Sequence, residues 1–254
     1  MIRCIGTRGR QGPALRGMMA LVAALALAGC SRAGDAPQTL DGARELPAPV
    51  SAASARGATR ARIVVLGDSL TAGLGLPSEE AYPSLLQQRI DSSGFDYEVV
   101  NAGVSGDTSA GGLSRLDWAL EGDVRILIVA LGGNDALRAL PADELKRNLS
   151  RIIERAQTRH IDVLLAGMEA PRNFGRDYIV AFHQVYPALA GQYHIPLVPF
   201  LLNGVAADPA LNQRDGIHPT AEGARIVADN VWTALKPLVE EQRRRTRKDG
   251  PAGS

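Results

Sequence analysis

The sequence predicts an α/β protein with a parallel sheet of about five strands. Two observations carry this prediction: short runs of β-branched and apolar residues recur along the chain, and stretches with apolar residues at helical spacing alternate with them. A third is the run VRILIVAL at residues 124–131, which is apolar almost throughout, as expected of a strand buried on both faces of a parallel sheet. These patterns fall between residues 61 and 240, a usual length for one domain.

The expected strands lie at residues 62–66, 97–101, 124–131, 162–166 and 196–198. Between them, apolar stripes predict four helices. The first follows Ser78, a suitable N-cap, and ends at Gly94. The second follows Pro141, and the fourth, the last before residue 240, has Pro237 near its end. The third helix has its stripe at Tyr178, Phe182, Val185, Tyr186 and Leu189.

The composition of the chain excludes several classes of protein. The chain has 254 residues, a formal net charge of +1 and two cysteines. A near-neutral charge argues against a general nucleic-acid binder, and two cysteines cannot build a disulfide framework or a cysteine-rich zinc site. The average hides an uneven distribution, because residues 61–240 carry 15 basic and 22 acidic side chains.

The N-terminus has the features of a secretory signal. Four arginines and no acid precede the apolar run MMALVAALALA at residues 18–28, which is too short to span a bilayer stably. The run leads into Leu27-Ala28-Gly29-Cys30, which resembles the bacterial lipobox. We therefore expect residues 1–29 to be a lipoprotein signal peptide and Cys30 to be lipidated, which anchors the protein to a membrane. Ser31 after the cysteine favours the outer membrane, facing the periplasm.

Both ends of the predicted domain are expected to be disordered. Residues 30–60 are rich in Ala, Pro, Gly and Ser, lack aromatic residues, and are predicted to form a tether. Residues 241–254 contain the run RRRTRK and are predicted to form a basic tail. This tail is either simply solvated or in contact with an anionic lipid or polymer.

Candidate catalytic residues follow the predicted strands, where parallel sheets place their functional sites. Ser69 comes directly after the first strand, and Asp215 and His218 are spaced so that a carboxylate can orient an imidazole. Gly106 and Asn134 follow the second and third strands and can supply hydrogen-bond donors to an oxyanion. Each residue alone also fits an ordinary N-cap or turn, so the prediction rests on their occurrence together.

Other catalytic motifs are missing from the sequence. It contains no G-x-x-x-x-G-K-[ST] phosphate loop, and Thr71 stands where the second glycine of a G-x-S-x-G elbow would be. The Asp–His pair has no further His or Cys cluster to complete a metal site.

These residues resemble the GDSL, or SGNH, hydrolase superfamily over residues 61–240. The blocks LGDSLTAGLGL, VNAGVSGDTSAGGLSRL, LGGNDALR and DGIHPTAEG are similar to those of its thioesterase I, lysophospholipase L1 and arylesterase group. The resemblance implies a flavodoxin-like three-layer α/β/α fold and no cofactor. It also implies a catalytic triad of Ser69, Asp215 and His218, with an oxyanion hole from Ser69, Gly106 and Asn134.

The resemblance implies a serine esterase that acts on lysophospholipid, fatty-acyl or aryl esters, with acyl thioesters as further substrates. Export makes cytoplasmic acyl-CoA a poor candidate for the natural substrate. We expect a monomer that binds no nucleic acid, and an acyl chain that contacts Leu137, Met168, Pro171, Asn173 and Phe174. Two alternatives remain: a carbohydrate O-deacetylase of the cell envelope, or a lipoprotein that binds without catalysis.

Overall fold

The computed structural model of the protein describes residues 60–249. The predicted signal peptide, Cys30 and almost all of the predicted tether lie outside the described residues. Arg60, which the prediction assigns to the tether, forms ion pairs with Asp91 (2.7 Å) and Asp96 (2.9 Å) and so packs with the domain. No helix of the described residues is long and apolar enough to cross a membrane.

Five parallel strands form one sheet in the order β2-β1-β3-β4-β5, as in flavodoxin-like folds. They are β1 (Ala61–Gly67), β2 (Tyr97–Gly103), β3 (Val124–Ala130), β4 (Asp162–Ala166) and β5 (Leu197–Val198). Six of the seven residues of β3 are buried, as the continuous apolar run predicts for a central strand. The α/β fold and its five-stranded parallel sheet confirm the fold predicted from the sequence.

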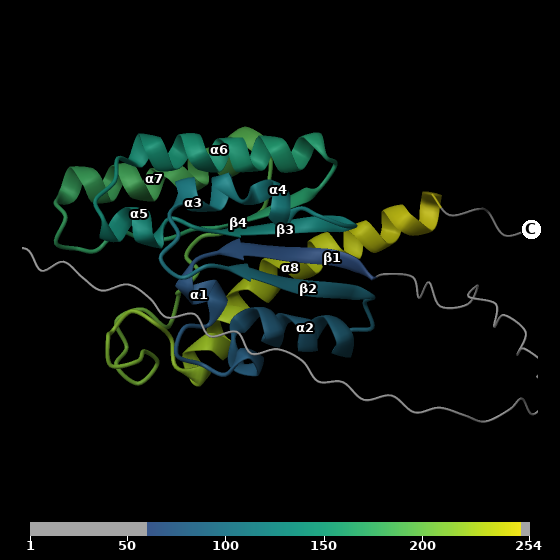
Figure 1. Cartoon of the computed structure of the whole chain (residues 1–254), viewed down its shortest axis with the longest axis horizontal. Helices are drawn as coiled ribbons and strands as arrows, with labels where there is room; N and C mark the ends of the chain where they lie inside the picture. The colour runs from purple at the N-terminus through teal and green to yellow at the C-terminus, as the bar shows by residue number, and fades with distance from the viewer. Residues whose placement is uncertain (1–59, 250–254) are drawn as a thin grey trace, which may run out of the picture. The chain divides into compact units, whose positions relative to one another are not determined.

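Helices cover both faces of the sheet (Figure 1). One layer contains α3 (Ser109–Ser114), α4 (Leu116–Ala119), α5 (Gly133–Leu137), α6 (Ala142–Thr158) and α7 (Arg176–Tyr193). The other contains α1 (Ser69–Ala72), α2 (Tyr82–Ser92) and α8 (Ala221–Asp249), and a 3-10 helix, η1 (Ser78–Glu80), precedes α2. The α6 stripe at Leu145, Leu149, Ile152, Ile153 and Ala156 is wholly buried, so periodicity alone identified its inner face.

The prediction of a disordered tail after residue 240 is wrong for residues 241–249, which continue α8. Pro237 lies inside the helix rather than near its end. Val239 is fully buried beyond it, and the Gln242 amide donates to Asp162 at the start of β4 (2.8 Å). These contacts hold a segment whose dense positive charge made it look like a solvated tail.

Candidate active site

The predicted catalytic side chains converge at the edge of the sheet where the strands end. Ser69 begins α1, the short helix that follows β1, and the Asp68 carboxylate caps this helix by accepting from Leu70 N–H (3.0 Å). Asp215 and His218 come from the loop before α8. Two segments distant in sequence therefore meet because both follow strands of one parallel sheet.

The Ser69, His218 and Asp215 side chains form one hydrogen-bonded chain. Nε2 of His218 lies 2.9 Å from Ser69 Oγ, and Nδ1 lies 2.7 Å from Asp215 Oδ2. An ionised carboxylate can only accept, so Nδ1 carries the proton and Nε2 of the neutral ring is free to accept from the serine hydroxyl. This is the geometry of a nucleophile, its base and the group that orients the base.

Asp215 is ionised across the ordinary pH range. Its Oδ1 accepts from the backbone N–H groups of His218 (3.0 Å) and Ile217 (2.9 Å), while Oδ2 takes the imidazole proton. These hydrogen bonds lower the pKa of Asp215 to about 2. The same bonds fix the turn, so the imidazole is held over Ser69.

Asn134 of the predicted oxyanion donors lines the same cleft as Ser69, and Gly106 lies in the loop after β2. Within residues 60–249, the backbone N–H groups of Ser69 and Gly106 donate to no protein acceptor, so both are available to a ligand. Gly106 has φ of +85°, a conformation that strains any side-chain-bearing residue. Arg138 donates to the Gly106 carbonyl (2.7 Å), which lies in the peptide unit after the one that carries the Gly106 N–H and helps to hold this loop.

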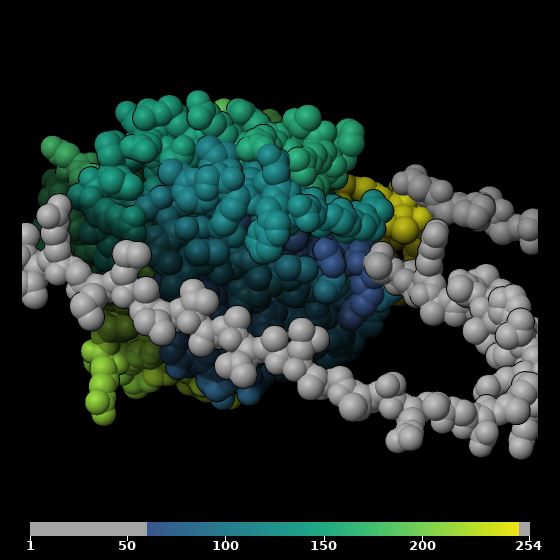
Figure 2. Space-filling model, viewed as in Figure 1, coloured from purple at the N-terminus to yellow at the C-terminus, as the bar shows by residue number. Residues whose placement is uncertain are grey.

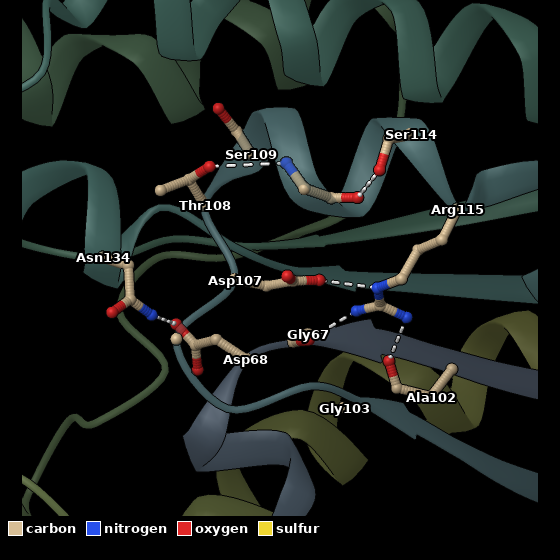
Figure 3. A network of polar contacts seen from close by, with 12 residues as sticks. Gly67, Asp68, Ala102, Gly103, Asp107, Thr108, Ser109, Ser114, Arg115 and Asn134 are labelled. Carbon is tan, nitrogen blue, oxygen red and sulfur yellow. Dashed lines mark hydrogen bonds and ion pairs between the residues drawn. The ribbon is translucent and has the colours of Figure 1, made fainter. Parts of the chain in front are cut away.

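Asn134 is held by a buried acid that the sequence reasoning did not select. Its Nδ2 donates to Asp68 Oδ2 (3.3 Å), and Asp68 is only 3% exposed (Figure 3). Burial raises the pKa of Asp68 to about 6, although the bonds from Leu70 and Asn134 oppose this rise. Asp68 lies inside the GDSL block, so its position was visible, but nothing in the sequence shows that it touches Asn134.

Arg115 ties together the ends of β1 and β2 (Figure 3). Its guanidinium donates to the carbonyls of Gly67 (2.8 Å) and Ala102 (2.7 Å) and to the Asp107 carboxylate (2.6 Å). Gly67 is two residues before the nucleophile, and Asp107 follows Gly106. One arginine thus sets the spacing between two parts of the predicted oxyanion hole.

A second buried acid joins the loops that carry Gly106 and Asn134. Asp135, 1% exposed, accepts from both the backbone N–H (2.8 Å) and the hydroxyl (2.5 Å) of Ser109. Asn148 of α6 also donates to the Ser109 hydroxyl (3.0 Å), which ties α6 to this network.

A cleft of about 580 Å³ opens beside Ser69 and His218. Leu137, Met168 and Pro171 of the predicted substrate-contacting residues line it, whereas Asn173 and Phe174 do not. The Phe174 ring instead packs near Tyr178, with centroids 5.8 Å apart. Apolar residues that the sequence did not single out complete the wall: Ala170, Phe200, Leu202, Ala206, Ala207 and Ile217.

Within the described residues, no group of three or more His, Cys, Asp or Glu side chains is arranged to hold a metal ion. The chemistry that the site offers is nucleophilic attack by Ser69 with neighbouring N–H donors. A flavodoxin-like α/β fold with this site defines a hydrolase that uses a serine nucleophile.

Comparison with known proteins gives the family. A profile of the GDSL-like Lipase/Acylhydrolase family matches residues 65–226, and the chain belongs to this family. It is 44% identical over 178 residues to Esterase TesA of Pseudomonas aeruginosa, covering 70% of this chain and 89% of that protein. It is 38% identical over 185 residues to Thioesterase 1/protease 1/lysophospholipase L1 of Escherichia coli strain K12, covering 72% and 88%.

A solved structure supports the same assignment. The crystal structure of TesA superposes with a TM-score of 0.68 at 44% identity and covers 70% of this chain and 99% of that one. Together with the family match, this confirms that the protein is an SGNH-fold serine ester hydrolase.

Proposed function

We propose that the protein hydrolyses carboxylic esters with an apolar acyl or aryl group, namely lysophospholipid, fatty-acyl or aryl esters, and that acyl thioesters are secondary substrates. The observation that carries this proposal is the 2.9 Å contact between Ser69 Oγ and His218 Nε2 at the wall of an apolar cleft. The cleft offers burial to an acyl chain or an aromatic ring.

Ser69 is the proposed nucleophile. As its Oγ bonds to the ester carbonyl carbon, the hydroxyl proton passes to His218 Nε2, and Asp215 stabilises the resulting imidazolium. The N–H groups of Ser69 and Gly106 and the amide of Asn134 bind the oxyanion. The imidazolium then protonates the leaving alcohol, which gives an acyl-enzyme, and water attacks this intermediate with His218 again acting as base.

The test of the mechanism is covalent labelling. A fluorophosphonate probe should label the parent protein and leave Ser69→Ala unlabelled, while Ser92→Ala, an exposed serine at the end of α2, serves as the matched control. Equal labelling of parent and Ser69→Ala, with no activity in either, would instead identify a binding protein without catalysis.

The test of the substrate class is a panel of esters. Hydrolysis of p-nitrophenyl esters of increasing chain length and of lysophosphatidylcholine should exceed hydrolysis of acetylated sugars. The apolar wall predicts that medium acyl chains give a higher kcat/KM than acetate. A preference for acetylated sugars with no turnover of lysophospholipid would replace this proposal with the carbohydrate deacetylase.

We further propose that Cys30 carries the lipid and that the protein faces the periplasm from the outer membrane. The support is the sequence around residues 1–31 alone. Labelling cells with a fatty acid should mark the parent and Cys4→Ala, because Cys4 lies within the predicted signal peptide. Labelling that survives Cys30→Ala would refute the anchor.

A further inference from the structure

The last turns of α8 form a concentrated positive surface. We call residues 236–248 the basic end of α8: it carries six cationic side chains (Lys236, Arg243, Arg244, Arg245, Arg247 and Lys248) against two acidic ones (Glu240 and Glu241). The rest of the domain is acidic, and the family profile ends at residue 226, so this surface lies outside the region that the family match covers.

Packing fixes the basic end of α8 on the domain. Val239 is fully buried, Gln242 is hydrogen-bonded to Asp162, and Arg245 pairs with the same carboxylate (3.2 Å). The Arg243 guanidinium lies over the ring of Phe95, 5.6 Å from its centroid. The helix backbone and the Arg243 and Arg245 side chains are therefore held on the domain, which spares a ligand part of the entropy cost of ordering the cations.

The cations surround a shallow hollow between the end of α2 and α8. Lys236, Arg243, Arg244 and Arg247 line it with Ser93, Phe95 and Glu240, and its volume is about 580 Å³. Glu241 is engaged by Arg244 (2.8 Å) and Arg245 (3.3 Å). Among the described side chains, no carboxylate lies within ion-pair distance of Arg243, Arg247 or Lys248.

This surface lies at the edge of the sheet opposite Ser69. Phe95 comes just before β2, and Asp162 is the first residue of β4, so the basic end of α8 sits where the parallel strands begin. Figure 1 shows it beyond the starts of the strands, with α1 and α5 at the other end, and in Figure 2 its yellow atoms protrude from the body of the domain. The described chain also enters at this edge, at Arg60.

We propose that the basic end of α8 binds the phosphate-bearing headgroups of an anionic bilayer and turns the catalytic cleft away from that bilayer. Cations presented by one packed helix beside a hollow match a surface of closely spaced headgroup phosphates. Substrate would then reach Ser69 from the side away from the docked membrane. The proposal does not depend on lipidation of Cys30.

The test is binding to vesicles with the chain from residue 31 onward, which lacks Cys30. This chain contains every described residue, and the solved TesA chain, 99% of which is covered, shows that the fold stands without a preceding segment. We expect sedimentation with phosphatidylcholine vesicles containing 30% phosphatidylglycerol, little with phosphatidylcholine alone, and release in 0.5 M NaCl.

Two variants that each lose four positive charges, one at the basic end of α8 and one elsewhere, test whether the position of the charges matters. The variant Arg243→Gln, Arg244→Gln, Arg247→Gln, Lys248→Gln should bind anionic vesicles more weakly by between about thirtyfold and about six-hundredfold, because each cation at an anionic surface contributes a factor of about five and four are removed. The control Lys146→Gln, Arg147→Gln, Arg151→Gln, Arg176→Gln removes the same charge from α6 and α7 and should bind like the parent. An equal loss in both variants, or none in the first, would overturn the proposal.

A separate measurement tests which edge of the domain faces the bilayer. Hydrolysis of a soluble p-nitrophenyl ester should continue at the same rate when the parent is fully bound to anionic vesicles, because the cleft stays open to water. Loss of this activity on binding would show that the catalytic edge, and not the basic end of α8, faces the membrane. Both charge variants should keep the parent's rate in solution, which verifies that they fold.

Discussion

The carboxyl group of Asp68 is buried beside Ser69, the proposed nucleophile, yet at neutral pH it is ionised. Its pKa of about 6 in the folded protein exceeds the ordinary value of 3.8 because it is desolvated. The unfolded chain therefore releases this proton at lower pH than the folded protein does. The contribution of Asp68 to the free energy of unfolding therefore falls as pH rises from about 4 to about 6. Above that range, the ionised Asp68 lowers the free energy of unfolding by about 3 kcal/mol.

Asp68→Asn should therefore stabilise the protein and impair catalysis. At pH 7.5 we expect a net gain of about 1–2 kcal/mol, because the neutral amide avoids the desolvation cost but gives up a charged cap of α1. The gain should vanish near pH 4, where Asp68 is protonated in the folded parent. Thermal unfolding at the two pH values measures this, and a gain of equal size at both would contradict the assigned cause.

The same variant should lower kcat by about ten- to a hundredfold. The asparagine oxygen cannot accept from both Leu70 and Asn134 in the way the two carboxylate oxygens do, so the Asn134 amide loses its fixed direction. A carboxylate near His218 also favours the imidazolium that forms during the reaction. Unchanged kcat with raised stability would show that Asp68 does not position Asn134.

Asp215→Asn tests the proposed orienting role of the carboxylate. An amide that turns its NH₂ group toward Nδ1 of His218 places the ring proton on Nε2, where it blocks acceptance from Ser69, and kcat should fall by about 10³–10⁴. Because the pKa of Asp215 is about 2, the parent carboxylate is ionised throughout the assay range, and the deficit should persist to the lowest pH assayed. Asp177→Asn, on the exposed first turn of α7, is the control. A deficit below tenfold would contradict this role.

At the level of elements, the edge of the sheet that carries the proposed triad is also held by contacts between strand ends. Arg115, with its side chain 17% exposed, is the only described residue that donates to the carbonyls of both Gly67 and Ala102. Arg115→Met would remove one donor from each of these carbonyls, although Gly67 still accepts from Val104 N–H (3.1 Å), and would take away the cation paired with the Asp107 carboxylate. We expect a loss of about 2–4 kcal/mol in the free energy of unfolding.

Arg115→Met should also reduce kcat about tenfold with little change in KM, because the spacing between Ser69 and Gly106 relaxes while the cleft remains. Arg115→Lys, which can replace one of the three bonds, should give intermediate values. Arg125→Met removes an exposed arginine paired with Asp123 and serves as the control. A lower melting temperature with unchanged kcat would assign Arg115 a structural role alone.

Sequence periodicity identified the long elements and missed the short ones. The five strands and the long parts of α2, α6 and α7 follow apolar patterns that burial itself imposes. By contrast, α1, α3, α4 and α5 span four to six residues, too few to show a helical period, and their positions depend on caps such as Asp68 and Thr108. The predicted start of the first helix at Ser78 falls instead on the 3-10 helix η1, and Ala81 caps α2.

The candidate site was predictable as a set of loops but not as a network. The order of the strands places Ser69, Gly106, Asn134 and His218 at one edge of any such parallel sheet. The partners that hold them, Asp68, Arg115 and Asp135, are polar residues whose contacts cross between elements. Their roles depend on burial and distance, which no single-sequence pattern encodes.

For the molecule as a whole, the two edges of the sheet differ. The ends of the strands carry the proposed catalytic groups, and their beginnings carry a set of contacts between α8 and β4 that we call the clasp. The clasp consists of Val239, which is fully buried, and Gln242 and Arg245, which satisfy Asp162. Truncation after Leu238 removes all three. We expect a loss of about 2–4 kcal/mol in the free energy of unfolding, from the lost apolar burial and the unpartnered carboxylate.

Because the clasp lies at the opposite edge from Ser69, the truncated protein should keep kcat and KM for a soluble ester within about twofold at temperatures where it stays folded. Truncation after Lys248 removes residues 249–254 alone and should leave both stability and kinetics unchanged. Chemical denaturation and steady-state kinetics on the two truncations measure the two edges independently. If truncation after Leu238 costs no stability, residues 239–248 behave as the solvated tail that their charge suggests, and the clasp does not hold α8 in solution.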